Sequence, residues 1–119
     1  MNHSMRFGSG STVPGKTDWK PYEPNHPIPG RGIFVDVDTS EFGFTKTPNY
    51  VASLCGNSSH WELTGTSSIY DPTPTKFRIY LRRSYNKHGQ ETPPLTPDMA
   101  NKLGWYVTWV GVEVRPISI

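Results

Sequence analysis

Residues 104–119 read GWYVTWVGVEVRPISI, the densest run of aromatic and β-branched residues in the chain. Such residues favour β-strands, whose side chains alternate between two faces. Trp105, Val107 and Trp109 therefore share one face, and the other face is also largely apolar: Tyr106, Thr108, Val110, Val112 and Val114. Gly111 indicates either a bulge or a close approach by another group. Because a strand with large apolar groups on both faces is usually covered by a second sheet or a partner chain, we predict that this segment is the middle strand of a small β-domain.

The length and composition of the chain also favour a small β-protein. Its 119 residues suit one domain with a single core. Aromatic residues make up 13%, and the 11 glycines and 12 prolines indicate many turns, as in a sandwich or barrel with short strands. The net charge of +2 is too small to indicate a nucleic-acid partner. Cys55 is the one cysteine, so we expect a small buried side chain, with an intermolecular disulfide as the alternative.

Alternating patterns predict further strands earlier in the chain. The clearest pattern places three apolar residues inward and three polar or aromatic residues outward: Phe77, Ile79 and Leu81, against Arg78, Tyr80 and Arg82. Thr96, followed by Pro97, predicts a short helical turn that ends at Gly104. The predicted fold class is all-β, with five or six strands at residues 33–38, 50–54, 60–64, 67–70, 76–83 and 104–116.

Residues 1–30 differ from the domain that we expect over residues 31–119. They contain five prolines and four glycines and show no periodicity, so we predict an extended Pro-rich arm. Its first half, residues 1–15, has the composition of a flexible segment. Trp19, Tyr22 and Ile28 are spaced along the second half, where they are candidate partner-binding residues. The arm then docks on a neighbouring subunit or lies over its own domain.

Four stretches carry a resemblance to a known family: residues 35–39 (VDVDT), 47–54 (TPNYVASL), 70–77 (YDPTPTKF) and 105–112 (WYVTWVGV). In this order they resemble the H-type lectin domain over residues 31–114. The resemblance implies a small six-stranded antiparallel β-sandwich, which assembles as trimers or hexamers and binds galactose-type sugars between protomers. Ser67 and Ser68 stand where the family has a sugar-contacting arginine, and the Pro-rich arm has no counterpart of its acidic loop. The resemblance therefore implies the fold and a homo-oligomer, without a sugar specificity.

Two groups of residues are candidates for a ligand site. His60 and Trp61, which follow Asn57, pair a hydrogen-bonding group with a flat apolar ring, as a sugar requires. The alternative is that Trp61 belongs to the core while His60 faces solvent. The second group comprises the outward residues of the strand at 76–83: Arg78, Tyr80 and Arg82. Basic residues around a tyrosine can bind acidic glycans or a phosphate with a stacked base, or they form a solvated face or a subunit contact.

The sequence gives no support for catalysis or for a cofactor. It has no recognisable Ser/His/Asp or Cys–His arrangement, metal-ligand spacing or Gly-rich phosphate loop, so we expect no enzyme. A calcium loop that begins at Asp36 would need glycine at its sixth position and glutamate at its twelfth, which are Glu41 and Thr47 here. We therefore interpret the acidic residues near Asp36 as a solvated strand face and expect no metal site.

The remaining expectations concern location and function. No apolar run approaches the ~18 residues of a membrane span, so we expect no membrane insertion. No hydrophobic signal-peptide core is visible, which favours the cytoplasm unless the chain is already processed. Two functions stay open: a non-catalytic carbohydrate-binding module that acts as an oligomer and binds a glycan or glycoprotein, or a structural protein that assembles into an oligomer or filament through its arm and exposed aromatic residues.

Overall fold

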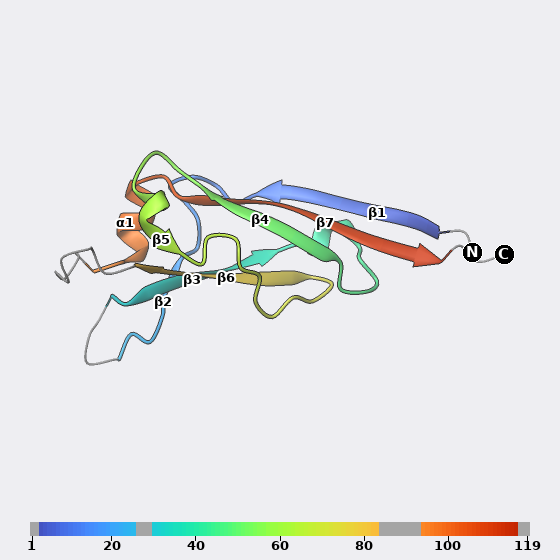
Figure 1. The fold of residues 1–119 in the computed structure, drawn as a ribbon, viewed down its shortest axis with the longest axis horizontal. Helices are drawn as coiled ribbons and strands as arrows, with labels where there is room; N and C mark the ends of the chain where they lie inside the picture. The colour runs from blue at the N-terminus through green and yellow to red at the C-terminus, as the bar shows by residue number, and fades with distance from the viewer. Residues whose placement is uncertain (1–2, 26–29, 84–93, 117–119) are drawn as a thin grey trace.

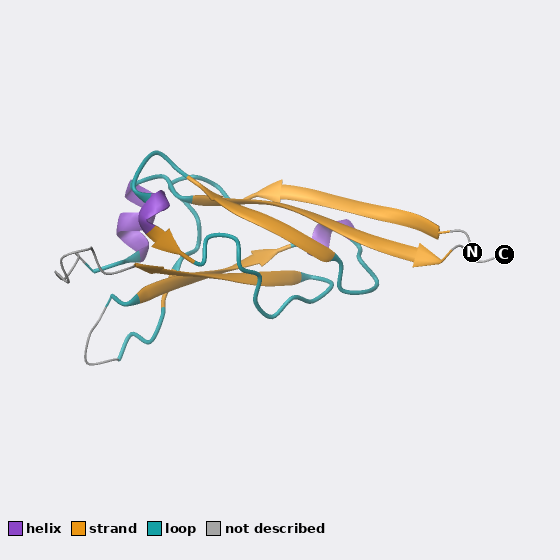
Figure 2. Ribbon diagram, viewed as in Figure 1, coloured by secondary structure: helices purple, strands orange, loops and turns teal. Residues whose placement is uncertain are grey.

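A computed structural model of the protein describes residues 3–25, 30–83 and 94–116. These residues form two antiparallel sheets that lie face to face (Figures 1 and 2). The three-stranded sheet has the order β1 (His3–Ser11), β7 (Tyr106–Pro116), β4 (Asn49–Cys55). The four-stranded sheet has the order β2 (Lys20–Pro21), β3 (Gly32–Asp38), β6 (Lys76–Arg83), β5 (Leu63–Thr64). The structure confirms the predicted all-β sandwich, with seven described strands because two are only two residues long and the N-terminal region adds β1.

Strand β7 is the middle strand of its sheet, as predicted. It pairs with β1 on one side and with β4 on the other. Trp105, Val107 and Trp109 are all buried. Both ladders pass Gly111 without a change of register, so no bulge forms there. Gly111 instead allows a close approach by other groups, because a Cβ on this residue would lie 3.2 Å from the rings of Phe44 and Tyr50.

The core lies between the inner faces of the two sheets. Alternation in β3 and β6 directs every second residue inward, and these side chains are almost completely buried. Tyr50 of β4 extends across the core, and its hydroxyl bonds the Thr39 side chain and the Thr73 carbonyl, each at 2.7 Å. The buried apolar residues of the two sheets are Ile33, Val35, Val37, Tyr50, Ala52, Leu54, Leu63, Phe77, Ile79, Leu81, Val107 and Trp109.

The N-terminal residues differ from the expected flexible segment. Residues 3–11 form β1, which pairs with β7 along its whole length, from His3 opposite Pro116 to Ser11 opposite Thr108. Glycine usually weakens a strand, but the two inward glycines of β1 make room for rings. A Cβ on Gly8 would lie 2.6 Å from Phe42, and one on Gly10 would lie 3.0 Å from Trp109. The packing of these rings and the pairing with β7 therefore outweigh the low strand propensity of the glycines in β1.

The segment after β1 lies over its own domain. Trp19 is only 4% exposed, and its indole N–H donates to the carbonyl of Trp105 at 3.3 Å. Strand β2 follows directly and pairs with Ile33 and Phe34 of β3. The arm was expected either on a neighbouring subunit or over its own domain. At Trp19, the described part of the arm lies over its own domain. Ile28 lies outside the described residues.

Three smaller elements complete the fold. The helix α1 (Pro97–Lys102) begins as predicted, with the Thr96 side chain accepting a hydrogen bond from the Met99 N–H. The 3-10 helix η2 (His60–Glu62) replaces most of the strand expected at residues 60–64, of which only β5 forms. Residues 67–70 contribute a single bridge, between Tyr70 and Arg78. Proline, glycine and serine flank these segments, and these residues favour turns over long strands.

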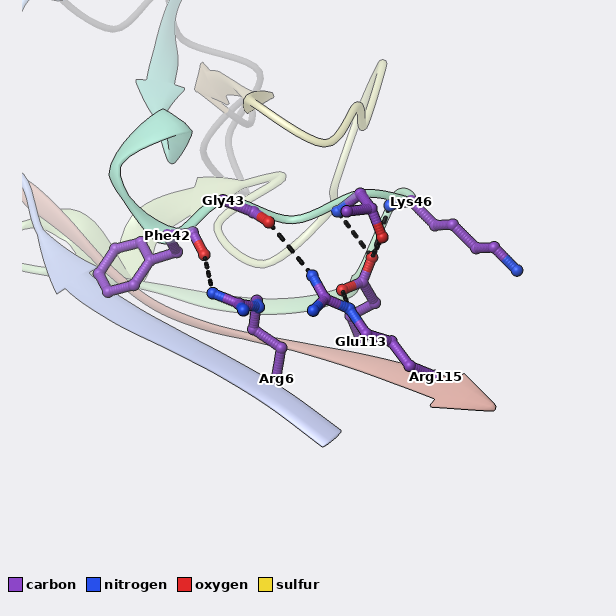
Figure 3. A network of polar contacts seen from close by, with 7 residues as sticks. Arg6, Phe42, Gly43, Lys46, Glu113 and Arg115 are labelled. Carbon is purple, nitrogen blue, oxygen red and sulfur yellow. Dashed lines mark hydrogen bonds and ion pairs between the residues drawn. The ribbon is translucent and has the colours of Figure 1, made fainter. Parts of the chain in front are cut away.

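Strands β1 and β7 run past the end of the four-stranded sheet as a two-stranded ribbon (Figure 1). The loop between the 3-10 helix η1 (Ser40–Phe42) and β4 covers the inner side of this ribbon. Arg6 donates to the Phe42 carbonyl at 3.1 Å, and Arg115 donates to the Gly43 carbonyl at 3.2 Å (Figure 3). Glu113, only 2% exposed, accepts hydrogen bonds from the same loop. These contacts stabilise a ribbon that would be marginal on its own.

Candidate functional site

An open groove of about 700 Å³ lies on the outer face of the four-stranded sheet. We call it the tyrosine groove. Its residues come from four separate parts of the chain: the segment after β2, the start of β3, the segment from β5 to residue 71, and β6. The groove is lined by Tyr22, Glu23, Arg31, Gly32, Thr64, Gly65, Ser68, Tyr70, Asp71, Tyr80, Leu81 and Arg82.

Tyr80 lies at the centre of an aromatic cluster in this groove. Tyr22 and Tyr70 contact it edge-on, with ring centroids at 5.5 and 4.9 Å and interplanar angles of 73° and 85°. Tyr22 is 42% exposed and Tyr70 48% exposed, so both side chains are partly open to solvent. Two backbone hydrogen bonds of 2.8 Å between Tyr70 and Arg78 fix the position of Tyr70 beside the strand. The cluster is thus a rigid, partly exposed aromatic surface.

An ion pair beside this cluster holds its central ring in position. Arg78 donates to both carboxylate oxygens of Asp36, at 2.7 and 2.9 Å, and to the Tyr80 hydroxyl at 3.0 Å. Its guanidinium also lies 4.2 Å from the centre of the Phe34 ring. The hydrogen bond from Arg78 lowers the pKa of Asp36 below its usual value, and that from Asp36 raises the pKa of Arg78. Arg78 is therefore engaged within the fold, and it positions Tyr80 rather than offering a free charge.

Two acidic residues border the tyrosine groove in a conformation that is uncommon for them. Glu23 has a φ of 49° and Asp71 a φ of 50°, both in the left-handed region. Strained backbone of this kind concentrates at ligand sites, where the surrounding structure must hold it. A hydrogen bond with Glu23 also raises the pKa of Tyr22 above its usual value. Gly65 faces the same groove with a φ of +89°, and a Cβ there would lie 2.3 Å from the Tyr80 carbonyl oxygen.

The charged groups of the tyrosine groove balance each other. Arg31 and Glu23 lie 3.7 Å apart as an ion pair. Arg82 and Asp71 add one positive and one negative group, and neither makes a side-chain hydrogen bond or ion pair within the described chain. The groove thus combines three tyrosines, hydroxyl groups and one free group of each sign. This arrangement can bind a ligand that has apolar faces and many hydrogen-bonding groups without a large net charge.

The structure separates the residues predicted for a ligand site. Tyr80 and Arg82 lie in the tyrosine groove, whereas His60, Trp61 and Asn57 do not line it. Trp61 is 83% exposed on η2, so it does not belong to the core. The loop before it is fixed to the domain, because Ser58 accepts a 2.8 Å hydrogen bond from the buried Trp105 indole. Whether His60 and Trp61 contact a ligand stays a prediction.

Some residues of the tyrosine groove were not predicted as ligand contacts from the sequence. Tyr22 was predicted as a partner contact, while Tyr70 was predicted only as the end of a strand at residues 67–70. The prolines after Asp71 indicate a turn, but nothing in the local pattern shows that this turn folds beside Tyr80. The acidic residues near Asp36 engage separate partners, since Asp36 pairs with Arg78 and Asp38 accepts a hydrogen bond from the Ser40 N–H at 2.9 Å.

Other features of the described residues concern metals and membranes. No group of three or more His, Cys, Asp or Glu side chains within residues 3–25, 30–83 and 94–116 is arranged to hold a metal ion. Over the same ranges no helix is long and apolar enough to cross a membrane. The resemblance to the H-type lectin domain stays a proposal. Comparisons with protein-family models and with curated proteins found no match to this chain.

Proposed function

We propose that the protein is a non-catalytic carbohydrate-binding module that acts as an oligomer, and that its glycan ligand lies in the tyrosine groove. The observation that carries this proposal is the cluster of Tyr22, Tyr70 and Tyr80 beside free polar groups. A sugar ring has C–H groups that pack on aromatic rings and hydroxyl groups that need donors and acceptors around them. The tyrosine groove offers both on one rigid surface, and the resemblance to the H-type lectin domain supports the same function.

The charges of the tyrosine groove favour a neutral glycan over an acidic one. The basic patch expected from Arg78 and Arg82 is reduced, because Arg78 already binds Asp36 with two hydrogen bonds. Arg82 is left, and Asp71 lies in the same groove. A sulfated or phosphorylated chain would meet Asp71 as well as Arg82, and Glu23 as well as Arg31, so the groove offers it no net attraction. The same argument opposes a nucleic-acid ligand, whose affinity depends on many phosphate contacts.

A glycan array can test this function. We expect the full-length protein to bind neutral glycans and to lose most of that binding in the Tyr70→Ala and Arg82→Ala variants. Both positions are exposed, so the melting temperature should change little. The His60→Ala, Trp61→Ala double variant serves as a comparison, because it tests the second candidate site without altering the tyrosine groove.

The outcomes separate the two sites. Loss of binding only in the groove variants supports the tyrosine groove, and loss in both sets means that the ligand extends to Trp61. If binding persists in folded Tyr70→Ala and Arg82→Ala proteins but disappears in the double variant, the ligand lies at His60 and Trp61 and the groove proposal is wrong. An array on which the wild-type protein binds nothing, at high protein concentration, contradicts a carbohydrate function.

A further inference from the structure

We infer that the outer face of the three-stranded sheet is covered by the same face of a second copy of this chain. Five large apolar side chains that are exposed in the described chain lie on this one face: Met5 and Phe7 of β1, Val51 of β4, and Val110 and Val114 of β7. Their exposed fractions range from 38% for Val110 to 65% for Val51. We call this surface the apolar face.

The strand register places these residues side by side. Met5 lies opposite Val114, Phe7 opposite Val112, and Val51 opposite Val110. Residues opposite each other in a sheet point to the same side, so the apolar residues form a continuous patch across three strands. Serine, threonine, asparagine, cysteine and tyrosine fill the other outward positions: Ser9, Ser11, Asn49, Ser53, Cys55, Tyr106 and Thr108.

None of these outward residues on the described strands carries a charge. The outer face of the four-stranded sheet differs clearly, since Lys20, Asp36, Asp38, Lys76, Arg78 and Arg82 all lie there. In a sheet with one solvated face, the strands normally alternate between apolar residues that point inward and polar or charged residues that point outward. The three-stranded sheet instead has apolar groups on both sides, which is the pattern of a sheet covered on both sides.

The footprint of the apolar face is at the low end of what an interface needs. Three strands about 4.8 Å apart and about 30 Å long give a footprint of roughly 400 Å² before side-chain relief is counted. Monomeric proteins rarely expose larger contiguous apolar patches than about 300–600 Å². A standard interface buries ~800 Å² on each partner, so the flat footprint alone is at the low end. We therefore expect an association that depends on protein concentration.

The absence of charge identifies the partner as a second copy. A surface without charge offers nothing to steer or orient a charged partner. When two identical faces meet across a two-fold axis, a charged residue near the axis would approach its own copy, and an uncharged face avoids that repulsion. The ribbon of β1 and β7 extends past the other sheet, so the apolar face reaches beyond the body of the protomer (Figure 1). This inference goes beyond the proposed function, since the tyrosine groove lies on the opposite sheet.

Charge substitution on the apolar face tests the inference. Val51 is 65% exposed, so Val51→Glu and Val51→Lys should both fold. We expect the wild-type chain to associate as its concentration rises in sedimentation velocity, and each variant to be shifted toward monomer at least tenfold in dissociation constant. Val13→Glu is the matched control, because Val13 is 56% exposed outside this face.

The inference is overturned if the wild-type chain stays monomeric at all concentrations. It is also overturned if Val51→Glu and Val51→Lys associate as the wild type does, or if Val13→Glu weakens association as much as they do, since a different face would then be the contact. Glycan binding by a monomeric wild-type protein would contradict this inference and leave the tyrosine groove intact. Association of the wild-type protein without any glycan binding would support this inference and contradict the proposed carbohydrate function.

Discussion

The backbone N–H of Lys46 donates a 2.5 Å hydrogen bond to the carboxylate of Glu113, a side chain that is only 2% exposed. The Thr45 N–H and hydroxyl donate to the same oxygen at 2.8 and 2.9 Å, and Arg115 donates to the other oxygen. A buried carboxylate is unfavourable unless its oxygens are satisfied in this way. Glu113 therefore ties the loop before β4 to the inner side of the ribbon (Figure 3).

This site should make stability depend on pH. Burial raises the pKa of Glu113, but the hydrogen bonds from Lys46, Thr45 and Arg115 outweigh it and lower the pKa from 4.5 to about 2. A carboxyl whose pKa is lowered by folding stabilises the protein above its unfolded value, and this contribution is lost as the pH falls through the folded value. We expect stability to fall between pH 4.5 and 2, and Glu113→Gln to lower stability at neutral pH and flatten that fall.

Urea unfolding at a series of pH values measures both effects. Glu41→Gln removes a carboxylate from an exposed position and is the matched control. Equal pH profiles for wild type and Glu113→Gln would contradict the role of Glu113.

Two tryptophans with opposite environments give a second prediction. Trp109 is 6% exposed and contacts the rings of Phe42, Tyr50 and Phe77, with centroid distances of 5.3, 6.0 and 6.1 Å. Truncating such a residue typically costs ~3–5 kcal/mol, which is much of the stability of a small domain. We expect Trp109→Ala to lose that amount in chemical denaturation. Trp61→Ala, at an 83% exposed position, should stay within about 0.5 kcal/mol of wild type. A loss in Trp109→Ala as small as the one expected for Trp61→Ala would show that Trp109 is not in the core.

The fold was predictable where a strand buries large side chains on one face. Phe77, Ile79 and Leu81 alternate with polar residues, and their strand has the predicted bounds. Strand β1 was not predictable in this way, because its inward positions include Gly8 and Gly10, which carry no side chain to give a pattern. Their environment depends on rings that lie far along the chain. Local sequence holds no information about that contact.

The candidate site was predictable only in part, for a similar reason. Alternation placed Tyr80 and Arg82 on the outer face of their strand, and the structure places them in the tyrosine groove. Tyr22 and Tyr70 reach the groove from segments about fifty residues apart, which come together only through the pairing of β2, β3 and β6. Arg78 had the same outward pattern as Arg82, but the structure pairs it with Asp36 on the neighbouring strand, which alternation along one strand could not indicate.

The pairing of β1 with β7 gives the last prediction, which compares two neighbouring positions of one strand. Gly8 is buried, and a Cβ there would lie 2.6 Å from Phe42 and 2.9 Å from Phe44, so Gly8→Ala forces both rings to move. Overpacking of this kind typically costs ~1–3 kcal/mol. Ser9→Ala changes an exposed residue of the outer face and should stay within about 0.5 kcal/mol of wild type. If residues 3–11 were a passive flexible segment, the two variants would unfold at the same denaturant concentration as wild type. A selective loss in Gly8→Ala, measured by urea denaturation of the full chain, is the result that the packing of β1 requires.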